Sequence, residues 1–302
     1  MKNIHLGLCC LFVDEPIHFK TVTLRTLRNF DRPRQLLKLS EICVHNASEL
    51  AVSVSTAYRL GIDVFRISSA LFPLATHPEA GYELANLPNH EEIFKTLGEV
   101  RSFSQKHRIR LSLHPDQFVV PVSPDPAVAA SSIRELRHQL MIAELTGASE
   151  INLHMGGVYG DKNAVIRRFA QVFESFPDGL QKRLTLENDD RSYTVSDLCG
   201  ICRDLDIPLV YDVHHHRCNQ DGFSIEEATA IAAETWRKSG LTPHFHISSP
   251  KNGWANPNIR PHADYIDPKD FPDCWRVLDA AVDVEAKAKE KAVVRLREDL
   301  CV

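Results

Sequence analysis

The sequence predicts a (β/α)8 barrel of the TIM type, formed by a single domain over residues 1–302. The chain length suits one such barrel, which typically takes about 250 residues. Short apolar runs rich in β-branched residues alternate with longer segments of helical periodicity, and each pattern occurs eight times. The strand runs are mostly apolar and show no amphipathic helical pattern, which fits a parallel sheet buried on both faces.

The expected elements follow one another along the whole chain. Strands are predicted at residues 4–8, 63–67, 109–113, 150–153, 184–187, 208–212, 244–247 and 282–285. Helices are predicted at residues 34–60, 90–107, 126–146, 161–176, 194–206, 224–240, 269–280 and 286–299. Two helices begin with capping-box spacing, in which an acid follows a hydroxyl residue by three positions: Thr194 with Asp197, and Ser224 with Glu227. We interpret segment 287–300 as an amphipathic helix that closes the barrel, with a basic arm for nucleic acid as the alternative.

Charge and composition limit the class of protein. Lys and Arg number 35 and Asp and Glu number 40, so the net charge of −5 argues against a generic polyanion binder with a broad basic face. No apolar stretch reaches the ~18 residues of a membrane span, and the first apolar run is too short for a signal peptide. Because we find no secretory signal, we interpret the eight cysteines as reduced thiols, including Cys199 and Cys202 despite their CxxC spacing. We expect a monomeric, cytoplasmic protein without an obligatory protein partner.

Titratable residues end six consecutive predicted strands. Active sites of such barrels lie at the carboxyl ends of the strands, so these side chains are expected to meet at one mouth. The strand-end residues are His114, His154, Glu187, Asp212 with His215, His244 with His246, and Glu285; the loops add His77 and His262. One histidine at a strand end would more often be structural, but so many buried titratable groups would be costly without counter-charge.

Divalent metal ions would supply that counter-charge. Imidazole and carboxylate ligands suit Zn²⁺, Mn²⁺ or Fe, and their number exceeds what one tetrahedral ion takes. Because a carboxylate such as Glu187 can bridge two ions, we expect two or three ions. A cluster of this kind is suited to phosphodiester hydrolysis by a metal-activated hydroxide.

Several segments resemble the UV damage endonuclease family, and the likeness runs from the first predicted strand to the last. The segments are residues 66–78, 114–118, 153–157, 186–189, 212–215 and 284–290. The resemblance implies an endonuclease-IV-like barrel with a cluster of metals, often manganese, although zinc, magnesium or iron could serve. It also implies nicking of damaged double-stranded DNA directly 5′ to pyrimidine dimers and related lesions. The implied metal ligands are His77, His114, His154, Glu187, Asp212, His215, His246, His262 and Glu285.

The resemblance implies roles for further residues. Gln117 and Phe118 match a Gln-Tyr pair that enters the duplex at the lesion, where an amide and a flat ring can fill the gap left by unstacked bases. Phe12 could stack on a base, and Arg66 and Lys287 could hold phosphate or support the ligands. We expect Glu187, Asp212, Glu285 and Lys287 to form the catalytic group.

Three positions depart from the family pattern. His244 replaces a lysine that can be carbamylated into a bridging carboxylate, so His244 is an additional candidate ligand of a different kind. Residues 8–12 are apolar where the family has a tyrosine and an asparagine, and Asp116 replaces a glycine. These departures leave two alternatives: a small-molecule metalloenzyme such as a sugar isomerase on the same barrel, and a damage-binding protein without catalysis.

Overall fold

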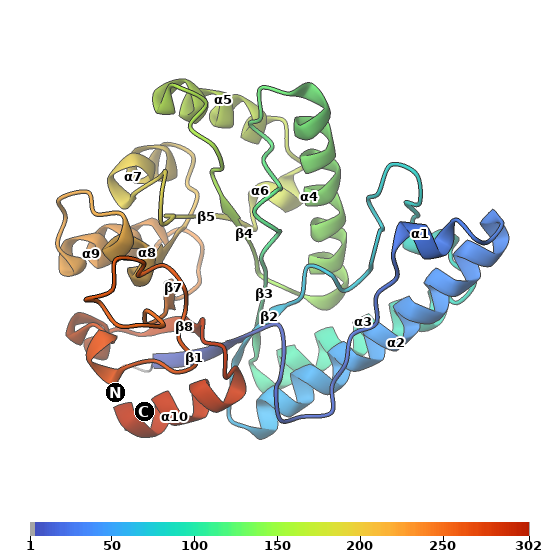
Figure 1. The fold of residues 1–302 in the computed structure, drawn as a ribbon, viewed down its shortest axis with the longest axis horizontal. Helices are drawn as coiled ribbons and strands as arrows, with labels where there is room; N and C mark the ends of the chain where they lie inside the picture. Colours follow the sequence, from blue (N-terminus) through green and yellow to red (C-terminus); the bar gives the residue numbers. More distant parts are fainter. Residues whose placement is uncertain (1–3, 302) are drawn as a thin grey trace.

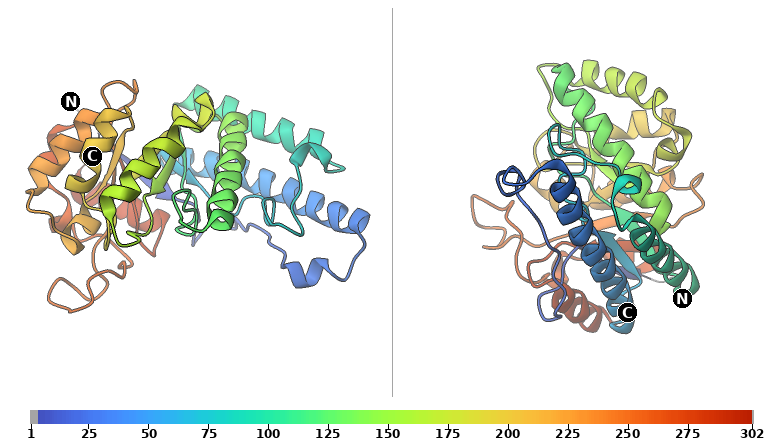
Figure 2. Two further views of the ribbon diagram at one scale, coloured as in Figure 1. Left: turned by 90° about the horizontal axis from the view of Figure 1, so that it is seen from above. Right: turned by 90° about the vertical axis from the view of Figure 1, so that its right-hand side faces the viewer.

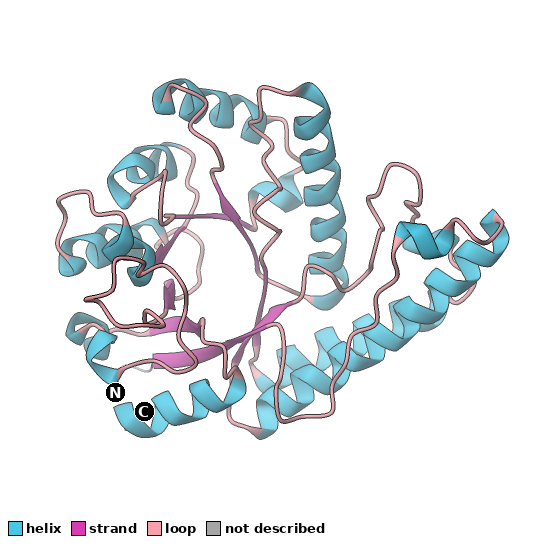
Figure 3. Cartoon of the chain, viewed as in Figure 1, coloured by secondary structure: helices cyan, strands magenta, loops and turns pink. Residues whose placement is uncertain are grey.

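Eight parallel strands form a closed barrel in the computed structural model, which describes residues 4–301. Each strand pairs with its neighbours in sequence, and β8 pairs with β1, so the sheet has no free edge. The strands are β1 Ile4–Cys9, β2 Val64–Ile67, β3 Arg110–Leu113, β4 Glu150–His154, β5 Leu184–Glu187, β6 Leu209–Asp212, β7 His244–Ile247 and β8 Ala280–Val284. The predicted barrel is confirmed, and Figure 3 shows its ring of strands inside a ring of helices.

Helices cover the outside of the barrel (Figure 1). The α-helices are α1 Leu24–Leu27, α2 Arg32–Arg59, α3 His90–His107, α4 Pro126–Thr146, α5 Lys162–Glu174, α6 Asp178–Gln181, α7 Val195–Asp204, α8 Val213–Cys218, α9 Ile225–Thr235 and α10 Glu290–Leu300. The 3-10 helices are η1 Leu84–Asn86, η2 Pro268–Asp270 and η3 Asp273–Val277. Both predicted capping boxes are present, at Thr194 before α7 and at Ser224 before α9. The pair α2 and α3 packs side by side and extends beyond the barrel (Figure 2).

The predicted helix at residues 269–280 is wrong. This segment holds only the end of η2, the short helix η3 and the first residue of β8. Pro272 explains the difference, because it has no N–H donor and disfavours a helical backbone at Phe271. The last helix begins at Glu290 and not at residue 286, since Lys289 just before it has a positive φ of 52°.

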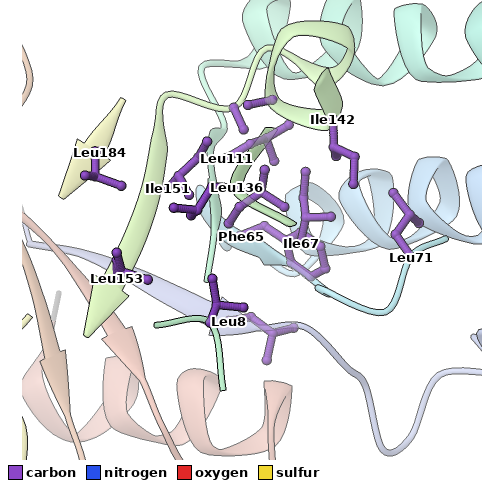
Figure 4. Close-up of a cluster of buried hydrophobic side chains, with 14 of the residues drawn as sticks. Leu8, Phe65, Ile67, Leu71, Leu111, Leu136, Ile142, Ile151, Leu153 and Leu184 are labelled. Carbon is purple, nitrogen blue, oxygen red and sulfur yellow. The ribbon is translucent and has the colours of Figure 1, made fainter. Parts of the chain in front are cut away.

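The strands divide the barrel into an apolar outer layer and a polar interior. Outward-facing residues such as Phe65, Leu111 and Ile151 pack with Leu136 and Ile142 of α4 in the core between strands and helices (Figure 4). Because side chains alternate along a strand, the intervening residues point into the barrel. Many of these are polar or charged: Arg66, Arg110, Ser112, Glu150, Asn152, Thr185, His244 and Asp283. This interior departs from the bulky branched filling usual in such barrels, and it leads to the carboxyl-end mouth.

Within residues 4–301, no helix combines the length and the apolar character needed to cross a membrane.

Candidate metal centre

Eight of the predicted ligands meet at the carboxyl ends of the strands. They are His114, His154, Glu187, Asp212, His215, His246, His262 and Glu285. Three groups each offer ligand atoms within 4.8 Å of one another: His114, His154 and Glu187; Glu187, Asp212 and His215; and His244, His246 and Asp283. The first two groups share Glu187, so this carboxylate lies at the middle of the centre.

Glu187 is 1% exposed and faces four imidazoles. Its Oε2 lies 3.0 Å from Nε2 of His114 and 3.7 Å from Nε2 of His154. Its Oε1 lies 3.3 Å from Nδ1 of His215 and 3.2 Å from Nδ1 of His246. These rings come from four different strand ends or the loops that follow them, so only the closed barrel brings them together.

Two polar side chains inside the barrel fix the orientation of Glu187. The amide of Asn152 donates a hydrogen bond to Oε2 of Glu187, and the hydroxyl of Thr185 donates to the Asn152 side-chain oxygen over 2.9 Å. Asn152 and Thr185 each lie two residues before a candidate ligand on the same strand, so they point to the same side. They form a supporting layer just beneath the ligands.

The end of β6 holds Asp212 and His215 through a helix cap. Asp212 is the N-cap of α8, and its Oδ1 accepts a hydrogen bond of 2.7 Å from the backbone N–H of His215. Asn188 exchanges two hydrogen bonds of 2.9 Å with the backbone N–H and C=O of Asp212. The short helix therefore places both side chains toward Glu187.

Glu285 and His262 come from the loops that surround β8. Oε2 of Glu285 lies 3.7 Å from Nδ1 of His262, and its Oε1 lies 3.5 Å from Nδ1 of His246. The loop after β7 is pinned by an antiparallel bridge between Pro250 and His262. This bridge holds His262 at the mouth, although His262 lies far along the loop from the end of β7.

The protonation states near Glu187 suit metal ligation. Burial opposes ionisation of Glu187, but His246 and hydrogen bonds from His114 and His215 hold its pKa well below the ordinary value. Burial lowers the pKa of His154 to about 4, so this imidazole is neutral near pH 7. For His215 burial lowers the pKa, but Asp212 and Glu187 outweigh it and raise the pKa. An ion bound by His215 would therefore displace a proton.

Unpartnered buried atoms show that the centre fits divalent cations. Nδ1 of His154, Oδ2 of Asp212 and Nδ1 of His246 are buried without a hydrogen-bond partner. Such atoms are costly unless something binds them. The donor set of carboxylates and imidazoles is one that manganese, zinc and iron accept.

His77 lies apart from the other predicted ligands. Its Nδ1 accepts hydrogen bonds from the backbone N–H groups of Glu79 and Ala80, at 3.1 and 3.3 Å. The residue lines a separate cavity of about 790 Å³ that Arg134 and Arg137 also line. The structure therefore does not bring His77 to Glu187.

Burial bears on the roles predicted for three further residues. Phe12 is 9% exposed and its ring lies parallel to that of Phe65 at 6.0 Å, so it belongs to the core and not to a DNA surface. Arg66 is 8% exposed and pairs with Glu285, so of its two predicted roles the contacts favour support of the ligands over a phosphate contact. Nδ1 of His244 lies 2.8 Å from Oε2 of Glu150, one layer beneath the mouth, and His244 remains a candidate ligand in the group with His246 and Asp283.

The other predicted contact residues are exposed. Gln117 and Phe118 lie in the loop after β3, and Phe118 is 76% exposed. The carboxylate of Asp116 accepts a hydrogen bond from the backbone N–H of Phe118, so Asp116 shapes this turn. Lys287 is exposed two residues after Glu285, and its backbone N–H is held by the carbonyl of Ala263.

Sequence reasoning missed three polar residues inside the barrel beneath the candidate ligands: Asn152, Glu150 and Asp283. All three are buried, and each lies on the inward face of a strand that ends in a candidate ligand. The signal was available as spacing: Asn152 precedes His154 by two positions, and Asp283 precedes Glu285 by two.

A parallel barrel with carboxylates and imidazoles gathered at its carboxyl end has the architecture of a TIM-barrel enzyme. The family model for UV-endonuclease UvdE matches residues 4–302. The UV DNA damage endonuclease of Bacillus velezensis is 33% identical over 300 residues, covering 96% of this chain and 91% of that protein. The chain belongs to the UV-endonuclease UvdE family, and the resemblance read from the sequence is confirmed.

Solved structures agree with this assignment. The crystal structure of SacUVDE superposes with a TM-score of 0.85 at 26% identity, covering 99% of this chain and 98% of that one. Endonuclease IV from Thermus thermophilus shares the fold, with a TM-score of 0.58 at 16% identity over 83% of this chain and 94% of its own.

Proposed function

We propose that this chain is a metal-dependent DNA repair endonuclease that nicks the backbone 5′ to pyrimidine dimers and related helix-distorting lesions. The observation that carries the proposal is Glu187, buried against four imidazoles at the catalytic face of a barrel that belongs to a UV-endonuclease family. The partner is damaged double-stranded DNA. The cofactor is two or three divalent ions, manganese first, with zinc, magnesium or iron as alternatives.

The eight residues that meet at the mouth would hold these ions. When bound, the ions supply Lewis-acid chemistry, which lowers the pKa of a water molecule and stabilises charge on the scissile phosphate. Oε2 of Glu187 faces His114 and His154 and its Oε1 faces His215, so this carboxylate could help to hold an ion in each of the two groups that share it. Asp212 and Glu285 supply the other carboxylates, and Lys287 is free to contact the phosphate.

The loop after β3 would read the damage. Gln117 and Phe118 are exposed at this loop, as side chains that enter a duplex must be. A dimer stacks and pairs poorly, so the duplex opens there at lower cost than at an intact step. The ring of Phe118 could then replace the lost stacking, and the amide of Gln117 could bond an exposed base edge.

The test is nicking of UV-irradiated supercoiled plasmid in Mn²⁺. We expect nicking that needs irradiation and stops in EDTA. Glu187→Gln keeps the side-chain shape but removes the charge, and we expect a rate loss greater than about 100-fold, since even supporting residues of metal sites cost about 10–100-fold. The matched control is Glu99→Gln, because Glu99 is exposed on α3 and pairs with the exposed Lys95 at 3.9 Å.

Two results would decide against the proposal. One is a wild-type rate for Glu187→Gln at saturating Mn²⁺. The other comes from an end-labelled duplex with a single dimer: cleavage must map directly 5′ to the dimer, and cleavage elsewhere contradicts the proposed position.

A further inference from the structure

The part of the molecule that extends beyond the barrel carries a concentration of positive charge. Residues 20–38, which include α1 and the start of α2, lie at the end of this extension (Figure 1), and we call them the arm segment. Although the chain as a whole is acidic, the arm segment holds six basic residues and one acid: Lys20, Arg25, Arg28, Arg32, Arg34 and Lys38, against Asp31. All of the six except Lys38 are exposed. Like charges so close in sequence repel one another, and a bound anion would relieve that repulsion.

The arm segment is fastened to the loop after β2. The guanidinium of Arg28 donates hydrogen bonds of 2.8 and 2.6 Å to the two carboxylate oxygens of Glu79. The guanidinium of Arg32 donates to the backbone carbonyls of Ala80 and Gly81, at 3.2 and 2.6 Å. Because the loop after β2 begins at the carboxyl end of a strand, these bonds hold the arm segment on the side of the barrel where the mouth lies.

Helix α4 adds two more guanidiniums to this region. Arg134 and Arg137 of α4 line the same cavity of about 790 Å³ as Arg32, and the lining contains one acid, Glu83. Nε of Arg134 also donates to the backbone carbonyl of Thr76 over 3.2 Å. Within residues 4–301, Arg28 pairs with Glu79, whereas none of the three arginines that line the cavity forms an ion pair with a carboxylate. The cavity therefore has positive charge and N–H donors in excess.

The cavity continues toward the exposed ring of Phe118. A second cavity, of about 580 Å³, is lined by Phe118 and also by Thr76. Because Thr76 lines both cavities, a depression in the surface leads from Phe118 to the three guanidiniums. The exposed ring and the excess positive charge thus lie along one path on the surface.

We propose that Arg32, Arg134 and Arg137, together with the arm segment, bind the phosphate backbone of the intact duplex on one side of the lesion. The inference rests on the proposed function and adds a second contact with the same DNA substrate. A guanidinium presents parallel N–H donors that match two oxygens of a phosphate. Contacts of this kind fix the position and direction of a duplex without reading its sequence. The three arginines are therefore positioning residues, which hold the duplex while Phe118 meets the damaged bases.

The experiment is single-turnover nicking, in Mn²⁺, of an end-labelled duplex that contains one dimer. The dependence of the rate on enzyme concentration gives the apparent Kd, and the plateau gives the rate of the chemical step. The variant is Arg134→Gln combined with Arg137→Gln. We expect the slope of log affinity against log salt to become shallower by about two, since each lost phosphate contact removes about 0.9. Between about 50 and 200 mM NaCl the wild type should then lose about tenfold more affinity than the variant, with equal plateau rates.

Two controls locate the contact. Arg237→Gln combined with Lys238→Gln removes the same charge from exposed residues between α9 and β7, near the amino end of the barrel, and should keep the wild-type slope. Duplexes are also shortened on one side of the dimer at a time. The difference between wild type and the α4 variant should vanish when one flank is removed and persist when the other is removed.

The outcomes separate this inference from the proposed function. Equal salt slopes for wild type and the α4 variant, or a difference that survives removal of either flank, would overturn the contact with flanking DNA while leaving the endonuclease intact. A folded wild type that does not nick the dimer duplex would contradict the proposed function and the inference together. If circular dichroism shows that the double variant does not fold, Arg137→Gln alone decides, with an expected slope change of about one.

Discussion

Gly7 shows how a single residue shapes the interior beneath the centre. It pairs with Asp283 across β1 and β8, and a side chain at this position would collide with that carboxylate. The backbone of Gly7 has no positive φ, so the requirement is for space alone. The absence of a side chain on β1 thus permits a buried acid on β8.

We predict that Gly7→Ala destabilises the fold by at least about 1–3 kcal/mol, the usual cost of overpacking. The matched control is Gly98→Ala in α3, where a Cβ would meet nothing within 4 Å. A helical glycine replaced by alanine should gain up to about 1 kcal/mol. Urea unfolding of both variants measures the difference, and equal midpoints would contradict the steric role of Gly7.

The candidate metal ligands at the strand ends could be predicted residue by residue from the sequence, but the distances between their side chains could not. Eight of the predicted ligands meet at the mouth because strand ends converge in any parallel barrel. His77 does not, since its position depends on the path of a loop whose backbone N–H groups bind the imidazole. Phe12 was assigned to DNA, and Arg66 to phosphate or to support of the ligands, because sequence position does not reveal how deeply a side chain is buried.

At the scale of elements, the loop after β3 combines a tight turn with an exposed ring. The turn is fixed by Asp116, whose carboxylate and carbonyl accept the backbone N–H groups of Phe118 and Val119. Val119 is buried, so the turn is anchored in the core while Phe118 points outward. A rigid turn places the ring without a large loss of conformational entropy on binding.

We predict that Phe118→Ala weakens binding to a dimer-containing duplex by about 1–3 kcal/mol, the value of one base–aromatic stack. Because the ring is exposed, stability should change by less than about 0.5 kcal/mol. Val277→Ala is the control, since Val277 is 62% exposed just before β8, at the opposite end of the barrel. Fluorescence anisotropy measures binding, and an unchanged affinity for Phe118→Ala would remove this loop from the interface.

The elements themselves were predicted unevenly, for physical reasons. The strands were found within two residues, because apolar runs covered by helices leave a clear pattern. Residues 269–280 misled the prediction, since Phe271, Trp275 and Leu278 have helical spacing although Pro272 interrupts the segment. The short helix α8 was missed because its six residues hold a cluster of histidines and no apolar periodicity.

For the whole molecule, the acidic balance is compatible with a DNA partner. The net charge is −5, and the two or three divalent ions of the proposed function would add four to six positive charges at the mouth. Positive potential would thus be concentrated at the mouth and beside it. Such a protein should bind intact duplex weakly and depend on distorted DNA.

We predict that Mn²⁺ stabilises the whole fold, because it binds groups that only the closed barrel brings together. An ion present at about 100 times its Kd should add about 2.7 kcal/mol per site and raise the Tm. Excess EDTA should reverse the shift, and Glu187→Gln should lose most of it. Differential scanning calorimetry measures the effect, and a Tm that does not respond to Mn²⁺ would contradict a metal centre at Glu187.

The pairing of β1 with β8 has a consequence for biosynthesis. The barrel closes only when residues 4–8 pair with residues 280–284. These two segments are synthesised far apart in time, so the closing contacts form late. Glu285 follows the last strand and is among the last of the candidate ligands to be synthesised. A chain that has been synthesised only to a point before Glu285 therefore lacks the complete ligand set, and the centre can form only after Glu285 has been added.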